Sequence, residues 1–160
     1  MQKISPFLWF DNQAEQAANF YVSIFKNSKI LGINRYGKAG SEVSGRKEGS
    51  VMTVAFSLDG QDFTALNGGP VFSFSQAISF VIDCKDQQEV DYFWEKLSKG
   101  GQQQPCGWLI DKYGVAWQVV PSSLEKMITG KEPKKAESAM RSMLQMKKID
   151  IKKIEKAYGQ

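Results

Sequence analysis

The sequence predicts an α+β protein with two tandem modules, each ordered strand, helix, strand, strand, strand (βαβββ), followed by a helical extension. The main observation is an internal duplication, in which the second module repeats the element order of the first and Phe20-Tyr21 superposes on Phe93-Trp94. The second observation is that strand-like runs give way to helical spacing after Pro121. We expect module one over residues 1–70, module two over residues 71–120 and the extension over residues 121–160.

Module one begins with a short strand rich in aromatic residues. Asn12 follows it and is placed to cap a helix, because apolar residues recur at helical spacing after it. The polar, glycine-rich residues 37–49 are typical of a mobile hairpin loop. Asp59-Gly60 is a hairpin dipeptide whose glycine tolerates positive φ. The predicted strands are residues 4–10, 29–36, 51–58 and 62–66.

Module two repeats this order. Asp86, with Glu89 three residues later, opens a helix by the same capping logic, and Gly100-Gly101 ends it. A turn from Asp111 to Gly114 joins the last two strands. The predicted strands are residues 77–82, 107–110 and 115–120.

The extension is predicted to be helical throughout. Ser122 and Glu125 have the spacing of a capping box, and Pro133 suits the first position of a helix. Met140, Met143 and Leu144 mark one apolar stripe, and Ile151, Ile154 and Tyr158 mark another. These stripes must dock either on the modules or on a second subunit.

Composition excludes several kinds of active site. The chain has no histidine, so catalytic triads with an imidazole base, three-histidine zinc sites and two-histidine iron sites are excluded within it. Cys84 and Cys106 lie far apart, which favours a reducing compartment. The start of the sequence lacks the apolar stretch of a signal peptide, and no run approaches the ~18 apolar residues of a membrane span. We expect a cytoplasmic protein without a membrane partner.

The positive charge lies in the extension. Residues 121–160 carry 10 Lys or Arg against 5 Asp or Glu, whereas residues 1–120 carry 11 against 12. Lysines spaced along amphipathic helices favour a solvated face. Nucleic-acid binding through this basic segment stays an alternative.

Several strings together resemble a known family. They are Phe7-Leu8-Trp9-Phe10, Asn67-Gly68-Gly69-Pro70, Cys106-Gly107-Trp108-Leu109 and the stretch from Asp111 to Trp117-Gln118. With them the chain resembles the PhnB-like branch, often labelled 3-demethylubiquinone-9 3-methyltransferase, of the glyoxalase/bleomycin-resistance (vicinal oxygen chelate) superfamily. The resemblance implies a glyoxalase-like domain over residues 1–120, in which two sheets curve around a shared cup, and a homodimer.

The resemblance also implies where a metal would bind. Members that use a metal place its ligands on the first and last strands of each module. In this sequence the corresponding positions hold Gln118, Ala77, and Asn67 or Ala65. Neutral amides and alanine are poor ligands for Zn²⁺ or Fe²⁺. We therefore expect no metal and no other cofactor.

The cup predicted by resemblance gives a set of candidate ligand-binding residues. Gln118 could orient a polar ligand or be a core amide, and strand alternation places Ala116 on its face and Trp117 in the core. Cys106 is interpreted as a pocket wall rather than a nucleophile, and Trp108 as an aromatic lid or a core residue. The remaining candidates are Asn67 (cup mouth or turn), Phe7 and Trp9 (cup or core) and Ala77.

These observations predict a metal-free protein that binds a small, partly apolar molecule. The alternative is an enzyme of lyase or isomerase type. No carboxylate pair suggests general acid/base chemistry, and spacing selects no catalytic residue. Methyl transfer is suggested by the family label alone, because neither Gly68-Gly69 nor Gly100-Gly101 has the strand-turn-helix context of a Rossmann methyltransferase.

Overall fold

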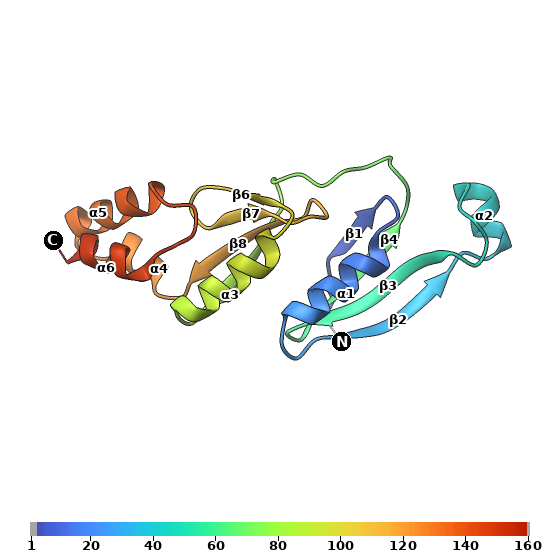
Figure 1. Ribbon diagram of the computed structural model, residues 1–160, viewed down its shortest axis with the longest axis horizontal. Coiled ribbons are helices and arrows are strands. Elements are labelled where there is room, and N and C mark those ends of the chain that lie inside the picture. The colour runs from blue at the N-terminus through green and yellow to red at the C-terminus, as the bar shows by residue number, and fades with distance from the viewer. Residues whose placement is uncertain (1–2, 160) are drawn as a thin grey trace. The chain divides into compact units, whose positions relative to one another are not determined.

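The computed structural model describes residues 3–159, which form two compact units divided between Phe74 and Ser75 (Figure 1). We call them unit 1 and unit 2. Each unit contains one four-stranded sheet, sheet A in unit 1 and sheet B in unit 2. Unit 1 extends beyond the predicted module boundary at residue 70 because Phe72 and Phe74 pack edge-on against Trp9 and Phe10.

Unit 1 has the strand order β1-β4-β3-β2, in which β1 is parallel to β4 and the other pairs are antiparallel. Its elements are β1 (Phe7–Phe10), α1 (Ala14–Ile24), β2 (Lys29–Arg35), α2 (Lys38–Ser44), β3 (Val51–Leu58) and β4 (Gln61–Asn67).

Unit 2 repeats this topology with the order β5-β8-β7-β6, again with the first and last strands parallel. The identical order confirms the two βαβββ modules, and the helices after β8 confirm the helical extension. Its elements are β5 (Phe80–Cys84), α3 (Gln87–Ser98), β6 (Gln102–Gln103), β7 (Trp108–Ile110), β8 (Ala116–Pro121), α4 (Leu124–Ile128), α5 (Pro133–Leu144) and α6 (Ile151–Tyr158).

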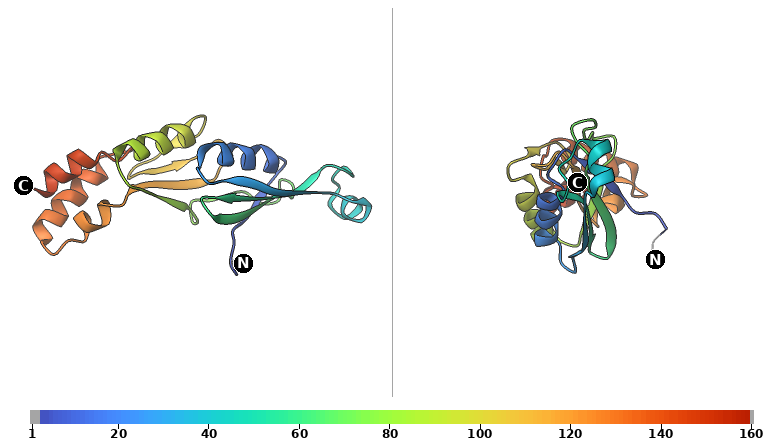
Figure 2. Two further views of the ribbon diagram at one scale, coloured as in Figure 1. Left: turned by 90° about the horizontal axis from the view of Figure 1, so that it is seen from below. Right: turned by 90° about the vertical axis from the view of Figure 1, so that its right-hand side faces the viewer.

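In each unit one long helix covers one face of the sheet (Figure 2). Tyr21 of α1 stacks on Phe56 of β3, and Trp94 and Leu97 of α3 are buried with Trp117 of β8. Burying one such side chain stabilises the fold by roughly 1.5–3 kcal/mol. The core of each unit therefore lies between the helix and the sheet. The other face of each sheet is turned away from that helix.

The two module helices are capped differently. At α3, Asp86 Oδ1 accepts a hydrogen bond from Glu89 N at 2.9 Å, as predicted. At α1 the predicted cap was wrong, because the N-cap is Gln13 and Asn12 makes no capping bond. Asn67 at the end of β4 satisfies the first helical N–H instead.

Three local predictions were also wrong. Residues 37–49 contain the helix α2 rather than only a loop. β5 begins at Phe80, so Ala77 lies in the exposed turn before the strand, because pairing with β8 starts only at Phe80 opposite Trp117. Ser122 does not cap α4, since its hydroxyl donates to the Cys84 carbonyl at 3.1 Å.

The extension docks on unit 2 of its own chain. The N–H groups of Cys106 and Gly107 donate to the carbonyls of Met146 and Lys147 at 2.8 and 2.7 Å. Ile149 and Ile154 are fully buried. The stripe that contains Ile154 therefore docks on the module of its own chain, whereas Leu144 of the other stripe stays 55% exposed.

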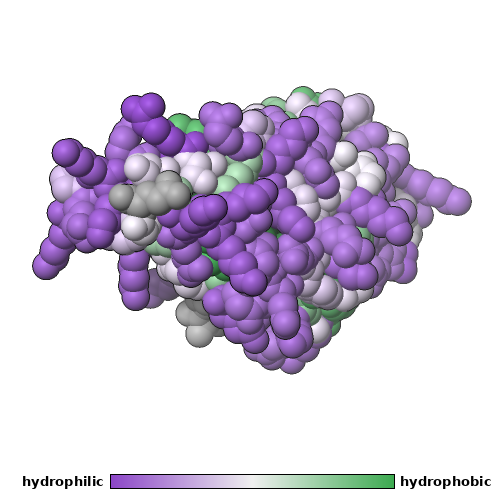
Figure 3. All heavy atoms as spheres, turned by 60° about the vertical axis from the view of Figure 1, so that its left-hand side comes forward, coloured by the Kyte–Doolittle hydropathy of each residue, from purple (hydrophilic) through white to green (hydrophobic). Residues whose placement is uncertain are grey.

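The basic side chains of the extension face solvent. The side of the molecule turned toward the viewer in Figure 3 is mostly hydrophilic. Four of these side chains form ion pairs: Lys135 with Glu132, Arg141 with Glu137, Lys148 with Asp91 and Lys153 with Asp150. Among the described residues, no helix combines the length and apolar character that a membrane crossing requires.

Candidate functional site

Strand β8 has a core side and an open side. Trp117 and Val119 are buried toward α3, so alternation directs Ala116, Gln118 and Val120 to the opposite side. The Trp117 indole N–H donates to Asp111 Oδ2 at 2.8 Å. The prediction that Trp117 packs in the core is confirmed.

The side of the sheet away from α3 forms the surface that we call the open face of sheet B. Gln118 lies at its centre, with Val81 of β5 and Trp108 of β7 as its neighbours across the strands. Val81 is 60% exposed, whereas Trp108 is half-buried. The strand residues of this face are Val81, Asp83, Gln102, Trp108, Ile110, Ala116, Gln118 and Val120, of which Ala116 is buried.

The Gln118 amide is held at one end only. Its Nε2 donates to Ser79 Oγ at 2.9 Å, whereas Oε1 accepts no hydrogen bond from the described residues. No buried side-chain nitrogen or oxygen atom among those residues lacks a partner. Gln118 Oε1 is therefore accessible on the open face. Gln118 is half-buried and has one polar atom available for a ligand.

Asp111 is a buried carboxylate whose full role the sequence did not reveal. It is 3% exposed and accepts hydrogen bonds from the N–H groups of Tyr113 and Val115 and from the Trp117 indole. The sequence predicted its place in a turn, and the structure adds its bond to Trp117. Asp111 fixes the start of β8 and is fully used by the fold.

On sheet A, β1 presents the predicted aromatic residues. Leu8 and Phe10 are buried toward α1, so Phe7 and Trp9 lie on the opposite face, where Phe7 is 61% exposed. The Trp9 indole N–H donates to the Gly69 carbonyl at 2.9 Å. Phe7 thus has an open surface, whereas the polar atom of Trp9 is already bonded.

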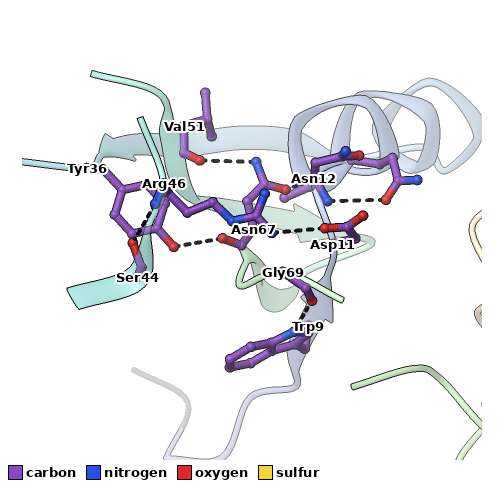
Figure 4. A network of polar contacts seen from close by, with 11 residues as sticks. Trp9, Asp11, Asn12, Tyr36, Ser44, Arg46, Val51, Asn67 and Gly69 are labelled. Carbon is purple, nitrogen blue, oxygen red and sulfur yellow. Dashed lines mark hydrogen bonds and ion pairs between the residues drawn. The ribbon is translucent and has the colours of Figure 1, made fainter. Parts of the chain in front are cut away.

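Asn67 serves the fold of unit 1 (Figure 4). Its Oδ1 accepts from Ala14 N at 2.8 Å, and its Nδ2 donates to the Val51 carbonyl at 3.1 Å. The Tyr36 hydroxyl donates to the backbone carbonyl of Asn67 at 2.7 Å. Of the two roles predicted for Asn67, these contacts favour the structural one.

Arg46 completes the same network. It was not identified from the sequence, because it lies in a polar, glycine-rich stretch without periodicity. Its Nη2 is 2.9 Å from Asp11 Oδ1, which ties the segment after α2 to the end of β1 (Figure 4). Both side chains border an open hollow of about 510 Å³ beside Gly68 and Gly69. Because Asp11 already neutralises Arg46, this hollow offers no unpaired charge to a ligand.

A second open hollow, of about 850 Å³, lies on unit 2 between α3 and the segment at Lys147 and Lys148. It contains none of the predicted site residues. Two of its charged groups, Asp91 and Lys148, pair at 2.7 Å, and this bond holds the pKa of Asp91 below its usual range.

The cysteines are placed apart from each other. Burial raises the pKa of the Cys84 thiol to about 12, with further contributions from the carboxylates of Glu89, Asp83 and Asp86. Cys106 has positive φ, and its Sγ lies 3.9 Å from the Met143 carbonyl of α5. Its thiol therefore packs against the extension.

The residues present do not fit the divalent metal of the superfamily. Within residues 3–159, no three His, Cys, Asp or Glu side chains gather into a metal-binding set. At the positions assigned by resemblance, Gln118 is a neutral amide, Ala77 is exposed in a turn and the Asn67 amide is bonded to backbone. This donor chemistry is unsuited to Zn²⁺ or Fe²⁺.

Comparison with known families gives a match over most of the chain. The family described as 3-demethylubiquinone-9 3-methyltransferase matches residues 2–120. No curated protein matches the sequence.

Solved structures include similar proteins. A putative 3-demethylubiquinone-9 3-methyltransferase (PhnB protein) from Bacillus cereus is 38% identical, with 75% of this chain and 99% of that chain covered and a TM-score of 0.66. A protein from Pseudomonas aeruginosa shares the fold at 18% identity, with 76% and 98% covered and a TM-score of 0.60. A glyoxylase/bleomycin resistance protein/dioxygenase domain from Frankia is 16% identical, with 76% and 92% covered and a TM-score of 0.43.

Proposed function

The chain belongs to the 3-demethylubiquinone-9 3-methyltransferase family, which includes the PhnB protein. From this premise we propose that it is a glyoxalase-like protein that binds a small, partly apolar molecule without a metal ion. The open face of sheet B carries this proposal. It combines an exposed apolar residue, Val81, with the half-buried Gln118, whose Oε1 is accessible. Binding sites typically pair apolar lining with a few placed polar groups.

Gln118 and Trp108 are the residues of unit 2 that we assign to the binding face. Ala116 lies on the same side of β8 but is only 2% exposed, so it is a weaker candidate. Phe7 and Trp9 are the corresponding candidates on sheet A. Asn67, Cys106 and Ala77 are weaker candidates, because the first two are engaged by the fold and Ala77 lies before β5.

We do not extend the methyltransferase name of the family to this chain. Methyltransferases of the Rossmann type bind their cofactor at a doubly wound parallel sheet. In both sheets described here, only the first and last strands of the module are parallel. The observed topology therefore supports binding in a glyoxalase-like fold rather than methyl transfer.

The test uses the neutral fluorescent probe N-phenyl-1-naphthylamine with the full chain. We expect saturable binding that EDTA leaves unchanged, and loss of binding in Gln118→Trp, which fills the open face. Gln88→Trp makes the same change at an exposed position of α3 and should bind normally. Absence of saturable binding, or equal binding by Gln118→Trp, would contradict the proposal.

We also infer a homodimer, on the basis of the family resemblance. Exposed apolar residues of unit 1, Val71 and Phe72, support it because they would gain from being covered. Light scattering after gel filtration should give twice the monomer mass. A monomer at micromolar concentration would contradict the inference.

A cytoplasmic location is the third part of the proposal. Cys84 and Cys106 are both unpaired thiols in the structure, as expected in a reducing compartment. Fractionation of the source cells should recover the protein with the cytoplasmic fraction. Recovery in a secreted fraction would overturn this location.

A further inference from the structure

Two neighbouring side chains on the open face of sheet B, Gln118 and Trp108, each keep a hydrogen-bonding atom without a protein partner among the described residues. The acceptor is Gln118 Oε1, and the donor is the indole Nε1–H of Trp108, which bonds to none of the described residues. Trp108 is half-buried, and no buried side-chain polar atom in the described part of the chain lacks a partner, so this N–H is also accessible. A ligand on this face can therefore bond to both.

The two groups stand side by side. Trp108 and Gln118 are directly opposite each other in the antiparallel pairing of β7 and β8. Opposite residues in such a pair have Cβ atoms about 4.5–5.5 Å apart. The two side chains therefore adjoin on the open face, within reach of one ligand.

Ser79 sets the orientation of the glutamine. Its hydroxyl oxygen accepts the hydrogen bond from Gln118 Nε2 at 2.9 Å, which uses a donor end of the amide. The amide therefore offers an acceptor to the ligand. Because Gln118 Oε1 can only accept and Trp108 Nε1 can only donate, a ligand group that donates to the first and accepts from the second satisfies both atoms.

The surroundings carry a single charge, and it is negative. None of the residues in strands β5, β6, β7 and β8 is a Lys or Arg, and their only acid, Asp83, lies on this face two residues along β5 from Val81. An anionic ligand would lose hydration without gaining a counter-ion here. Val81, Ile110 and Val120 supply apolar contact around the polar pair.

We propose that the ligand of this face carries a neutral group with an N–H and a C=O side by side, as in a carboxamide, lactam or imide, bonded to Gln118 Oε1 and Trp108 Nε1. The apolar part of the ligand lies on Val81. This inference rests on the proposed binding function and specifies the chemical class that the face selects.

The experiment displaces N-phenyl-1-naphthylamine with three compounds that share one ring system: 2-naphthamide, 2-naphthoate and 2-methylnaphthalene. One hydrogen bond contributes about 0.5–1.5 kcal/mol, so 2-naphthamide should displace the probe at roughly fivefold or more lower concentration than either analogue. Trp108→Phe should weaken 2-naphthamide by about two- to tenfold more than it weakens 2-methylnaphthalene, because only the amide loses a hydrogen bond. Tyr92→Phe, at an exposed position of α3, is the control and should leave the displacing concentrations of both compounds unchanged.

The outcomes separate the inference from the function on which it rests. If the probe binds but the three compounds displace it equally, or 2-naphthoate is strongest, the ligand class is wrong and the binding function stands. If Trp108→Phe is indistinguishable from the wild type toward 2-naphthamide, the assigned donor is wrong. If the probe does not bind at all, both fail. As a second readout, the indole N–H NMR signal of Trp108 should shift with 2-naphthamide and much less with 2-methylnaphthalene.

Discussion

Asn67 Oδ1 at the end of β4 accepts a hydrogen bond from the backbone N–H of Ala14, a residue 53 positions away, at 2.8 Å. The cap of α1 is therefore supplied by another strand rather than by the residues before the helix. The same amide donates to the Val51 carbonyl, so one side chain joins α1, β3 and β4. This bond is possible because β4 runs parallel to β1, which leads into α1.

Asn67→Ala should destabilise the protein by about 2–3 kcal/mol, because it removes a helix cap and leaves the Val51 carbonyl without its partner. Urea unfolding followed by circular dichroism measures the change. Asn12→Ala is the matched control at the position predicted from sequence, and it should cost less than about 0.5 kcal/mol. The reverse order of the two effects would contradict the capping role of Asn67.

Asp111→Asn should destabilise unit 2 by about 1–3 kcal/mol, because an amide cannot accept all three hydrogen bonds that the buried carboxylate accepts. The near-ultraviolet circular dichroism of Trp117 should change as its partner is altered. Asp83→Asn, at an exposed position of β5, is the control. Equal thermal stability of the two variants would show that the hydrogen bonds of Asp111 do not stabilise unit 2.

Cys84 should resist alkylation in the folded protein, because burial raises its thiol pKa from 9.0 to about 12. The folded state thus binds a proton that the unfolded state releases between these values. The contribution of Cys84 to stability is fully present below pH 9 and is lost as the pH rises toward 12. Urea unfolding across this range should show a decline that is smaller in Cys84→Ala.

Alkylation checks the same residue directly. Iodoacetamide followed by peptide mass spectrometry should leave Cys84 unmodified at pH 8 in the folded protein and modify it in urea. Rapid modification of Cys84 in the native state would contradict the buried, neutral thiol.

Gly107→Ala should destabilise the protein by about 2 kcal/mol or more. Gly107 has a φ of 81°, and an added Cβ would lie 2.7 Å from the Val119 carbonyl oxygen and 3.2 Å from Ile149 of the extension. Thermal unfolding measures the loss. Gly32→Ala is the control, since an added Cβ there meets nothing within 4 Å and φ is not positive. A loss no larger than that of Gly32→Ala would mean that the extension adjusts freely at this contact.

The sequence alone determined the features that depend on local spacing. Alternation along β8 placed Trp117 in the core and Gln118 on the other face, because successive side chains of a strand point to opposite sides. The Asp86 cap was also predicted from local spacing, because its partner Glu89 lies within the first turn of the helix. Repetition of the element order predicted both modules.

Only the tertiary structure decided which distant residues meet. It placed Asn67 at the start of α1, and it docked the extension on Cys106-Gly107 of the same chain. It also set the register that brings Trp108 opposite Gln118. Local periodicity assigns each side chain a face, but partners far apart in sequence are chosen by the pairing of strands and the packing of helices, where many weak contacts act together. The candidate site depends on one such pairing, between β7 and β8.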